Sequence, residues 1–81
     1  MTARDEVLLA AYQLADASPD GTFTVDEVTD ALKAAGTIYK ESTIRTHVVS
    51  RMCANAPDNH AVTYDDFVRV GEGRYRLNPA R

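Results

Sequence analysis

Residues 41–52 constrain the fold most, because their side chains divide into an apolar side and a polar side at helical spacing. At roughly 100° per residue, one arc carries the apolar side chains Ile44, Val48, Val49, Met52 and Ala56. The other arc carries short polar groups and a histidine. We therefore predict a helix over 42–56 that is capped by Ser42, or alternatively by Glu41, and that ends before Pro57.

Two helices and a short strand are predicted before this segment. Alanine, valine and leucine at helical spacing indicate a helix over 4–17. The run TFT at 22–24 favours a short strand. A capping box over 24–27 then begins a second helix, predicted over 25–35, and Gly36 is placed to close it.

The C-terminal part has the alternation of a β-hairpin. Two β-prone runs, 67–70 and 74–77, are joined by the three residues Gly71-Glu72-Gly73. By the two-residue period of a strand, the face toward the core carries Phe67, Tyr75 and Leu77. Arg74 and Arg76 then share the opposite, exposed face.

In order, these elements make a single α+β domain over 1–81. Three short motifs resemble winged helix-turn-helix DNA-binding domains: Phe23-Thr24-Val25-x-x-Val28, Ser42-Thr43-Ile44-Arg45-x-His47-Val48 and Val70-Gly71-x-Gly73-x-Tyr75-x-Leu77. They are most similar to small bacterial winged-helix proteins found beside restriction or phage-defence proteins. The resemblance implies three helices, a short strand and a two-stranded wing over 67–77. It also implies a non-enzymatic protein, either a transcriptional regulator or the DNA-binding part of a defence system, with the third helix in the major groove of double-stranded DNA and the wing on the backbone or minor groove.

The candidate contacts follow from this arrangement. The predicted DNA-binding residues are Lys40, Ser42, Thr43, Arg45, Thr46, His47, Ser50, Arg51, Arg74 and Arg76. Short hydroxyls allow a helix to approach base edges closely, and arginine and lysine suit phosphates. Two alternatives stay open: the polar helix face is only a solvated face, or the hairpin arginines protect a strand edge from aggregation. Arg69 is also open, because it could lie beside Tyr75 or pair with Asp65 or Asp66.

Charge is divided unevenly along the chain and allows a second function. The net charge is −3, but seven acidic and two basic residues make the part through Gly36 −5, and the part from Thr37 onward is +2. The acidic half could instead serve a protein–protein interaction through the first two helices. We expect a monomer, or a weak dimer through the first helix.

Catalysis, metal binding and membrane insertion find little support. Asp65 and Asp66 lack a third ligand at strand or helix spacing, and His47 and His60 fall on different elements. We expect no cofactor, and the lone Cys53 cannot form an internal disulfide. No apolar run approaches the roughly 20 residues that span a bilayer, and the first residues lack the pattern of a secretory signal. A cytoplasmic protein is therefore expected.

Overall fold

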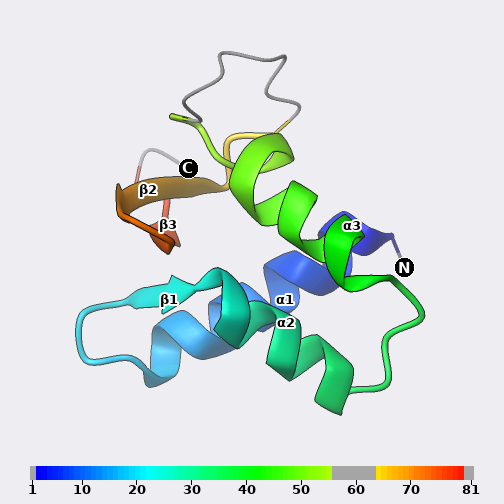
Figure 1. The fold of residues 1–81 in the computed structure, drawn as a ribbon. Coiled ribbons are helices and arrows are strands. Elements are labelled where there is room, and N and C mark those ends of the chain that lie inside the picture. The colour runs from blue at the N-terminus through cyan, green and yellow to red at the C-terminus, as the bar shows by residue number, and fades with distance from the viewer. Residues whose placement is uncertain (1, 56–63, 80–81) are drawn as a thin grey trace.

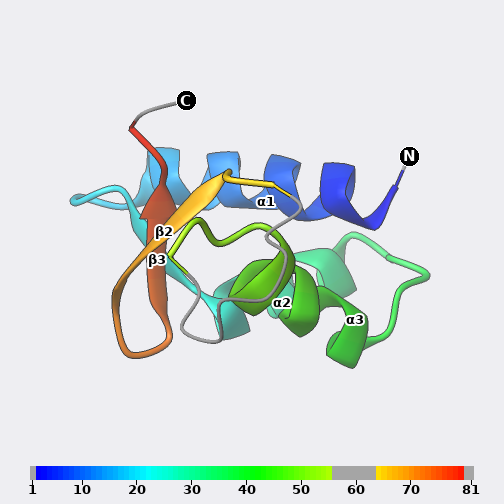
Figure 2. The same cartoon turned by 90° about the horizontal axis from the view of Figure 1, so that it is seen from above.

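The computed structural model describes residues 2–55 and 64–79 and has three helices and a three-stranded antiparallel sheet (Figure 1). The predicted α+β class is therefore confirmed. Helix α1 extends along the domain, with the sheet beside its C-terminal half and the third helix nearer its start (Figure 2). Within the described ranges, no helix is both long enough and apolar enough to cross a membrane.

Helix α1 (Ala3–Ala17) begins one residue before its predicted start because Thr2 caps it. The Thr2 hydroxyl accepts from the backbone N–H of Asp5 at 3.2 Å, and the Asp5 carboxylate accepts from the Thr2 N–H at 3.2 Å. This reciprocal pair satisfies backbone donors that a helix start leaves free. Val7 and Ala11 are fully buried and fix the face that α1 turns to the core.

The turn after α1 is held by the Asp20 carboxylate. Its Oδ1 accepts hydrogen bonds from the hydroxyl of Thr22 at 2.7 Å, the hydroxyl of Ser18 at 2.8 Å and the backbone N–H of Thr22 at 3.1 Å. These donors, the Thr22 hydroxyl first, lower the pKa of Asp20 to about 2. Because the charged form persists through the neutral range, it keeps organising the turn into strand β1 (Thr22–Thr24).

Helix α2 (Val25–Ala34) ends one residue before the predicted limit of 35 and has the predicted capping box. The Thr24 hydroxyl accepts from the Glu27 N–H at 3.1 Å, and the Glu27 carboxylate accepts from the Thr24 N–H at 2.8 Å. At the other end, Gly36 has a φ of 79°, a left-handed conformation that glycine adopts without strain. The predicted role of Gly36 in closing the helix is confirmed.

Helix α3 (Glu41–Thr46) continues into a π-helical segment, η1 (His47–Arg51), and we call the two together helix three. The predicted cap at Ser42 or Glu41 is wrong, because Lys40 is the extended residue before the first turn and no side chain caps it. The predicted end at 56 is also wrong. Helix three ends at Arg51, five residues earlier, although position 56 itself lies outside the described residues.

Helix three ends earlier than predicted because the backbone that follows it forms hydrogen bonds with strand β2. The Met52 N–H donates to the His47 carbonyl at 2.8 Å, a π-type bond that closes the last turn. The Phe67 N–H donates to the Met52 carbonyl at 2.8 Å, and the Ala54 N–H donates to the Phe67 carbonyl at 2.8 Å. Cys53 is thereby drawn into a bridge with Phe67, so the backbone leaves the helix to meet strand β2.

The wider π turn also determines which side chains of the predicted apolar arc are buried. Ile44, Val48 and Met52 are buried and lie four residues apart, a spacing that drifts by about 40° per step in a regular α-helix. A π turn holds more residues and keeps this row directed inward. Val49 was placed on the same apolar arc, but it lies one position off the row and is 37% exposed, so it is not part of the buried core.

The sheet contains one strand more than the predicted two-stranded hairpin. Strands β2 (Phe67–Gly71) and β3 (Arg74–Leu77) form the hairpin, but β1 pairs with β3 on its other side, giving the order β1-β3-β2. Gly71 belongs to β2, so the connection is two residues rather than the predicted three, with a bulge between Arg69 and Gly71. The extra strand places Phe23 in the core, where its ring meets that of Phe67 edge to face at 5.1 Å.

A buried ion pair joins α1 to the segment before β2. Arg4 donates to both carboxylate oxygens of Asp66, from Nη2 at 2.9 Å and from Nε at 3.1 Å, and this hydrogen bonding raises the pKa of Arg4. The Asp66 side chain is only 1% exposed. The Arg4 guanidinium also lies 4.2 Å from the centre of the Tyr64 ring. The pairing of Asp66 with Arg69 considered above is therefore not the one formed.

Candidate functional site

Helix three gathers half of the predicted contact residues around one shallow hollow. The hollow has a volume of about 330 Å³ and is lined by Ser42, Thr43, Thr46, His47 and Arg51. Ser50 lies on the same helix and is half-buried. The polar side of helix three is therefore a continuous surface of short side chains with one exposed arginine.

Two side chains on this surface are oriented by carbonyls one turn earlier. The Thr46 hydroxyl donates to the Ser42 carbonyl at 2.9 Å, so its oxygen lone pairs remain available as acceptors. The Nδ1 of His47 lies 2.8 Å from the Thr43 carbonyl. Because a carbonyl can only accept, Nδ1 carries the proton, and Nε2 of a neutral His47 is left as an acceptor.

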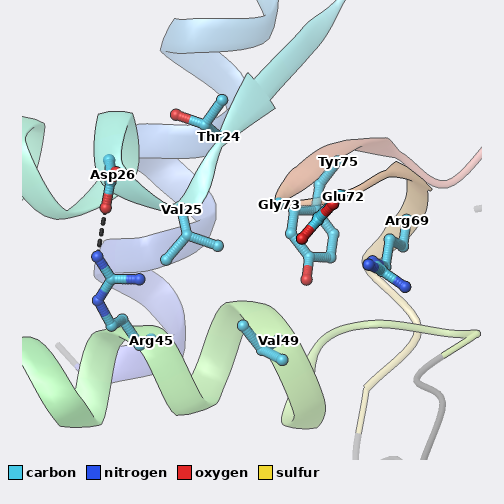
Figure 3. A pocket seen from close by; sticks show the side chains of 9 residues that line it. All are labelled: Thr24, Val25, Asp26, Arg45, Val49, Arg69, Glu72, Gly73 and Tyr75. Atoms are coloured by element: carbon cyan, nitrogen blue, oxygen red, sulfur yellow. Dashed lines mark hydrogen bonds and ion pairs between the residues drawn. The ribbon is translucent and has the colours of Figure 1, made fainter.

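Arg45 is placed differently, because acidic side chains already hold it. Its guanidinium donates to Asp26 on α2 (Figure 3). It also donates to Glu41 one turn earlier, at 3.3 Å. These bonds, with Glu41 first, raise the pKa of Arg45. Glu41 also accepts from Lys33 at 2.8 Å, and that lysine first and Arg45 second lower the pKa of Glu41. Any anion that binds Arg45 must compete with two carboxylates.

A groove separates helix three from the tip of the hairpin. This hairpin groove has a volume of about 510 Å³, and its lining residues are Thr24, Val25, Asp26, Arg45, Val49, Arg69, Glu72, Gly73 and Tyr75 (Figure 3). Tyr75 is 2% exposed, and burial raises the pKa of its hydroxyl. That hydroxyl points into the space above Val49 and makes no hydrogen bond with the residues that the structure describes. The groove therefore has an apolar floor with a free phenol and charged sides.

Arg69 is a cation that lines this groove and was not among the predicted DNA-binding residues. It pairs across the hairpin with Tyr75, so both side chains lie on the same face of the sheet. The amide of Asn55 holds the Arg69 backbone, accepting from its N–H at 2.8 Å and donating to its carbonyl at 3.1 Å. Within 2–55 and 64–79 its guanidinium forms no ion pair. The two-residue period from Phe67 was the signal that could have identified it.

Arg74 and Arg76 share an exposed face, as the strand period predicts, but it is the opposite face of the sheet from Tyr75. Their cross-strand partners are Thr24 and Thr22. The Arg74 guanidinium donates to the Thr22 hydroxyl at 3.0 Å, which draws it over β1. The structure therefore does not bring these two arginines together with the polar side of helix three.

Lys40 and Cys53 differ in their exposure to solvent. Lys40 is exposed at the start of α3, at the end of helix three that carries Ser42. Cys53 is buried, and its thiol donates to the Asn55 side-chain oxygen at 3.2 Å. In the part of the chain that the structure describes, no three His, Cys, Asp or Glu side chains are grouped so that they could hold a metal ion. His60 lies outside the described residues.

Comparison with known proteins identifies a family. No curated protein matches the chain, and no solved structure matches it. One family model does match, over residues 6–77, from the first turn of α1 to the last residue of β3. The chain therefore belongs to the family described as domain of unknown function DUF7669.

Proposed function

We propose that this domain is a winged helix-turn-helix that binds double-stranded DNA. Helices α2 and α3 are its helix-turn-helix, and the β2–β3 hairpin is its wing. Helix three lies in the major groove, and the wing meets the backbone or the minor groove. The resemblance of its motifs to bacterial winged-helix proteins favours a transcriptional regulator or the DNA-binding part of a defence system.

The observation that carries the proposal is that helix three contributes to two hollows that offer different kinds of contact. Short polar groups line the first hollow, and Arg69 of β2, which forms no ion pair within the described residues, lines the hairpin groove opposite Arg45 and Val49 of helix three. A helix with short side chains can approach base edges, while an arginine on a neighbouring strand reaches the phosphates. Because helix three contributes to both hollows, a single duplex that lies on this helix meets both.

The contacts divide by chemistry. Thr46 and a neutral His47 present acceptors, which suit the amino groups of adenine or cytosine in the major groove. Lys40, Arg51 and Arg69 are exposed cations on or beside helix three and suit phosphates. Arg74 and Arg76 project from the far face of the sheet, so a duplex on helix three reaches them only around the sheet edge. We therefore assign them a smaller share than Arg69.

Salt dependence of duplex binding tests this proposal. Three phosphate contacts predict that the logarithm of the association constant falls with the logarithm of salt concentration with a slope of about −3. Fluorescence anisotropy of a labelled random-sequence duplex, measured at several salt concentrations, gives this slope. If no complex forms even at the lowest salt concentration, the proposal is wrong.

Asp26→Asn is expected to strengthen duplex binding about threefold beyond the effect of charge alone, because it frees part of the Arg45 guanidinium. Asp30→Asn is the matched control, since it removes the same charge from an exposed position on α2. The affinities of both variants for one duplex are compared at low salt. Equal gains in the two variants would mean that Arg45 does not contact DNA.

A further inference from the structure

We infer that a second surface, formed by α1 and the C-terminal half of α2, docks a basic amphipathic helix of a partner protein. The surface is a groove of about 490 Å³ whose lining includes Leu9, Ala10, Gln13, Ala31, Leu32 and Ile38. It shares no lining residue with the hollow on helix three or with the hairpin groove. A partner here and a duplex on helix three can therefore be bound together.

Several apolar side chains at this α1–α2 groove are exposed. Ile38 is 87% exposed and Leu9 is 51% exposed, and Tyr12 is half exposed one turn after Leu9. Of the five large apolar side chains exposed in the described ranges, these three lie on or beside the groove, while Val49 and Val70 lie elsewhere. Apolar side chains gathered in this way on a small domain mark a contact surface.

The shape of the groove suits a helix. Two packed helices form its walls, and alanines at Ala10 and Ala31 leave a low floor between the larger Leu9 and Ile38. A helix that lies in such a groove inserts apolar side chains spaced three and four residues apart. The apolar side chains of the partner helix therefore pack against Leu9 and Ile38.

The rim of the groove selects the charge of the partner. Glu6 lines the groove, and Asp5 and Asp16 lie one turn before and two turns after Leu9 on α1, so all three supply negative charge along this side of the helix. The single base of α1, Arg4, is held by Asp66, and Lys33 of α2 is held by Glu41. Basic side chains on the partner complement this rim, whereas a second copy of this chain would oppose acid with acid.

A titration followed by NMR tests the inference with the complete chain. The probe is a short amphipathic helix built only from leucine and lysine, and the matched probe has glutamate in place of lysine. The lysine peptide is expected to shift the amide resonances of α1 and of residues 31–38, while the glutamate peptide leaves them unchanged. Absence of shifts, shifts confined to other elements, or equal binding of both peptides would overturn the inference.

Substitutions distinguish binding of the peptide in this groove from unspecific electrostatic attraction to the domain. Ile38→Ser removes an exposed apolar anchor without opening the core and is expected to weaken the lysine peptide about tenfold. The control Val70→Ser removes an exposed apolar side chain on β2 and should leave binding unchanged. Glu6→Gln with Asp16→Lys should also weaken binding about tenfold. If the unliganded chain self-associates in sedimentation and Ile38→Ser abolishes that association, the occupant is a second copy and the inference is wrong.

Discussion

Arg4→Met is expected to lower the free energy of unfolding by about 3 kcal/mol, because it removes the guanidinium that forms an ion pair with the buried Asp66 carboxylate. Methionine keeps the length of the apolar stem, so the loss reports the charge and its hydrogen bonds more than packing. At 0.05–0.15 kcal/mol per residue, an 81-residue domain has a total stability of about 4–12 kcal/mol. The loss is therefore a large fraction of the whole, and urea denaturation followed by circular dichroism measures it.

Three further variants isolate the cause. Arg4→Lys keeps the charge but not the two-pronged geometry, so it should lose less than Arg4→Met. Arg4→Met with Asp66→Asn removes the buried charge itself and should recover part of the stability. Lys33→Met breaks the exposed pair with Glu41 and should cost less than about 1 kcal/mol. A loss for Arg4→Met as small as that for Lys33→Met would contradict the assigned importance of the buried pair.

Features set by neighbouring residues were predictable from the sequence. The capping box of Thr24 and Glu27 and the glycine closure at Gly36 need only a few consecutive residues, and both are present. The alternation in 74–77 gave the faces of β3 correctly. In each case the decisive hydrogen bond or side-chain direction lies within one turn or one strand.

Features set by distant residues were not predictable. Helix three ends at Arg51 because the backbone after it bonds to Phe67, sixteen positions further along the chain, and no local signal marks that partner. The strand over 22–24 was predicted correctly, but its place in the sheet depends on the distant pairing between Phe23 and Tyr75. The predicted end at 56 rested on Pro57, which is the nearest local signal that stops a helix.

The same distinction applies to the candidate site. Helical spacing alone collected the residues around the hollow on helix three. It could not show that Asp26, nineteen positions before Arg45, holds that arginine. Helical spacing also could not show whether Arg69 lies beside Tyr75 or pairs with Asp66. That outcome depends on the ion pair between Arg4 and Asp66. Tertiary pairing therefore changes which cations are free, and with them the expected DNA contacts.

Arg51→Ala with Arg69→Ala is expected to weaken duplex binding roughly 30-fold at low salt and to reduce the salt slope by about 2. Each lost phosphate contact costs about 1 kcal/mol of binding free energy. Arg51 lines the hollow on helix three and Arg69 lines the hairpin groove, so the pair flanks the proposed path of the duplex. Both side chains are exposed, so their loss should leave the fold intact. Anisotropy titrations at several salt concentrations give both quantities.

Arg74→Ala with Arg76→Ala is the matched control, because it removes the same charge from the far face of the sheet. A uniform electrostatic attraction would weaken binding equally in the two double variants, since both lower the net charge by the same amount. Contact through helix three and the hairpin groove makes the Arg51 and Arg69 pair the more damaging by about tenfold. The reverse order would mean that DNA meets the outer face of the sheet, and helix three would then lose its assigned place in the major groove.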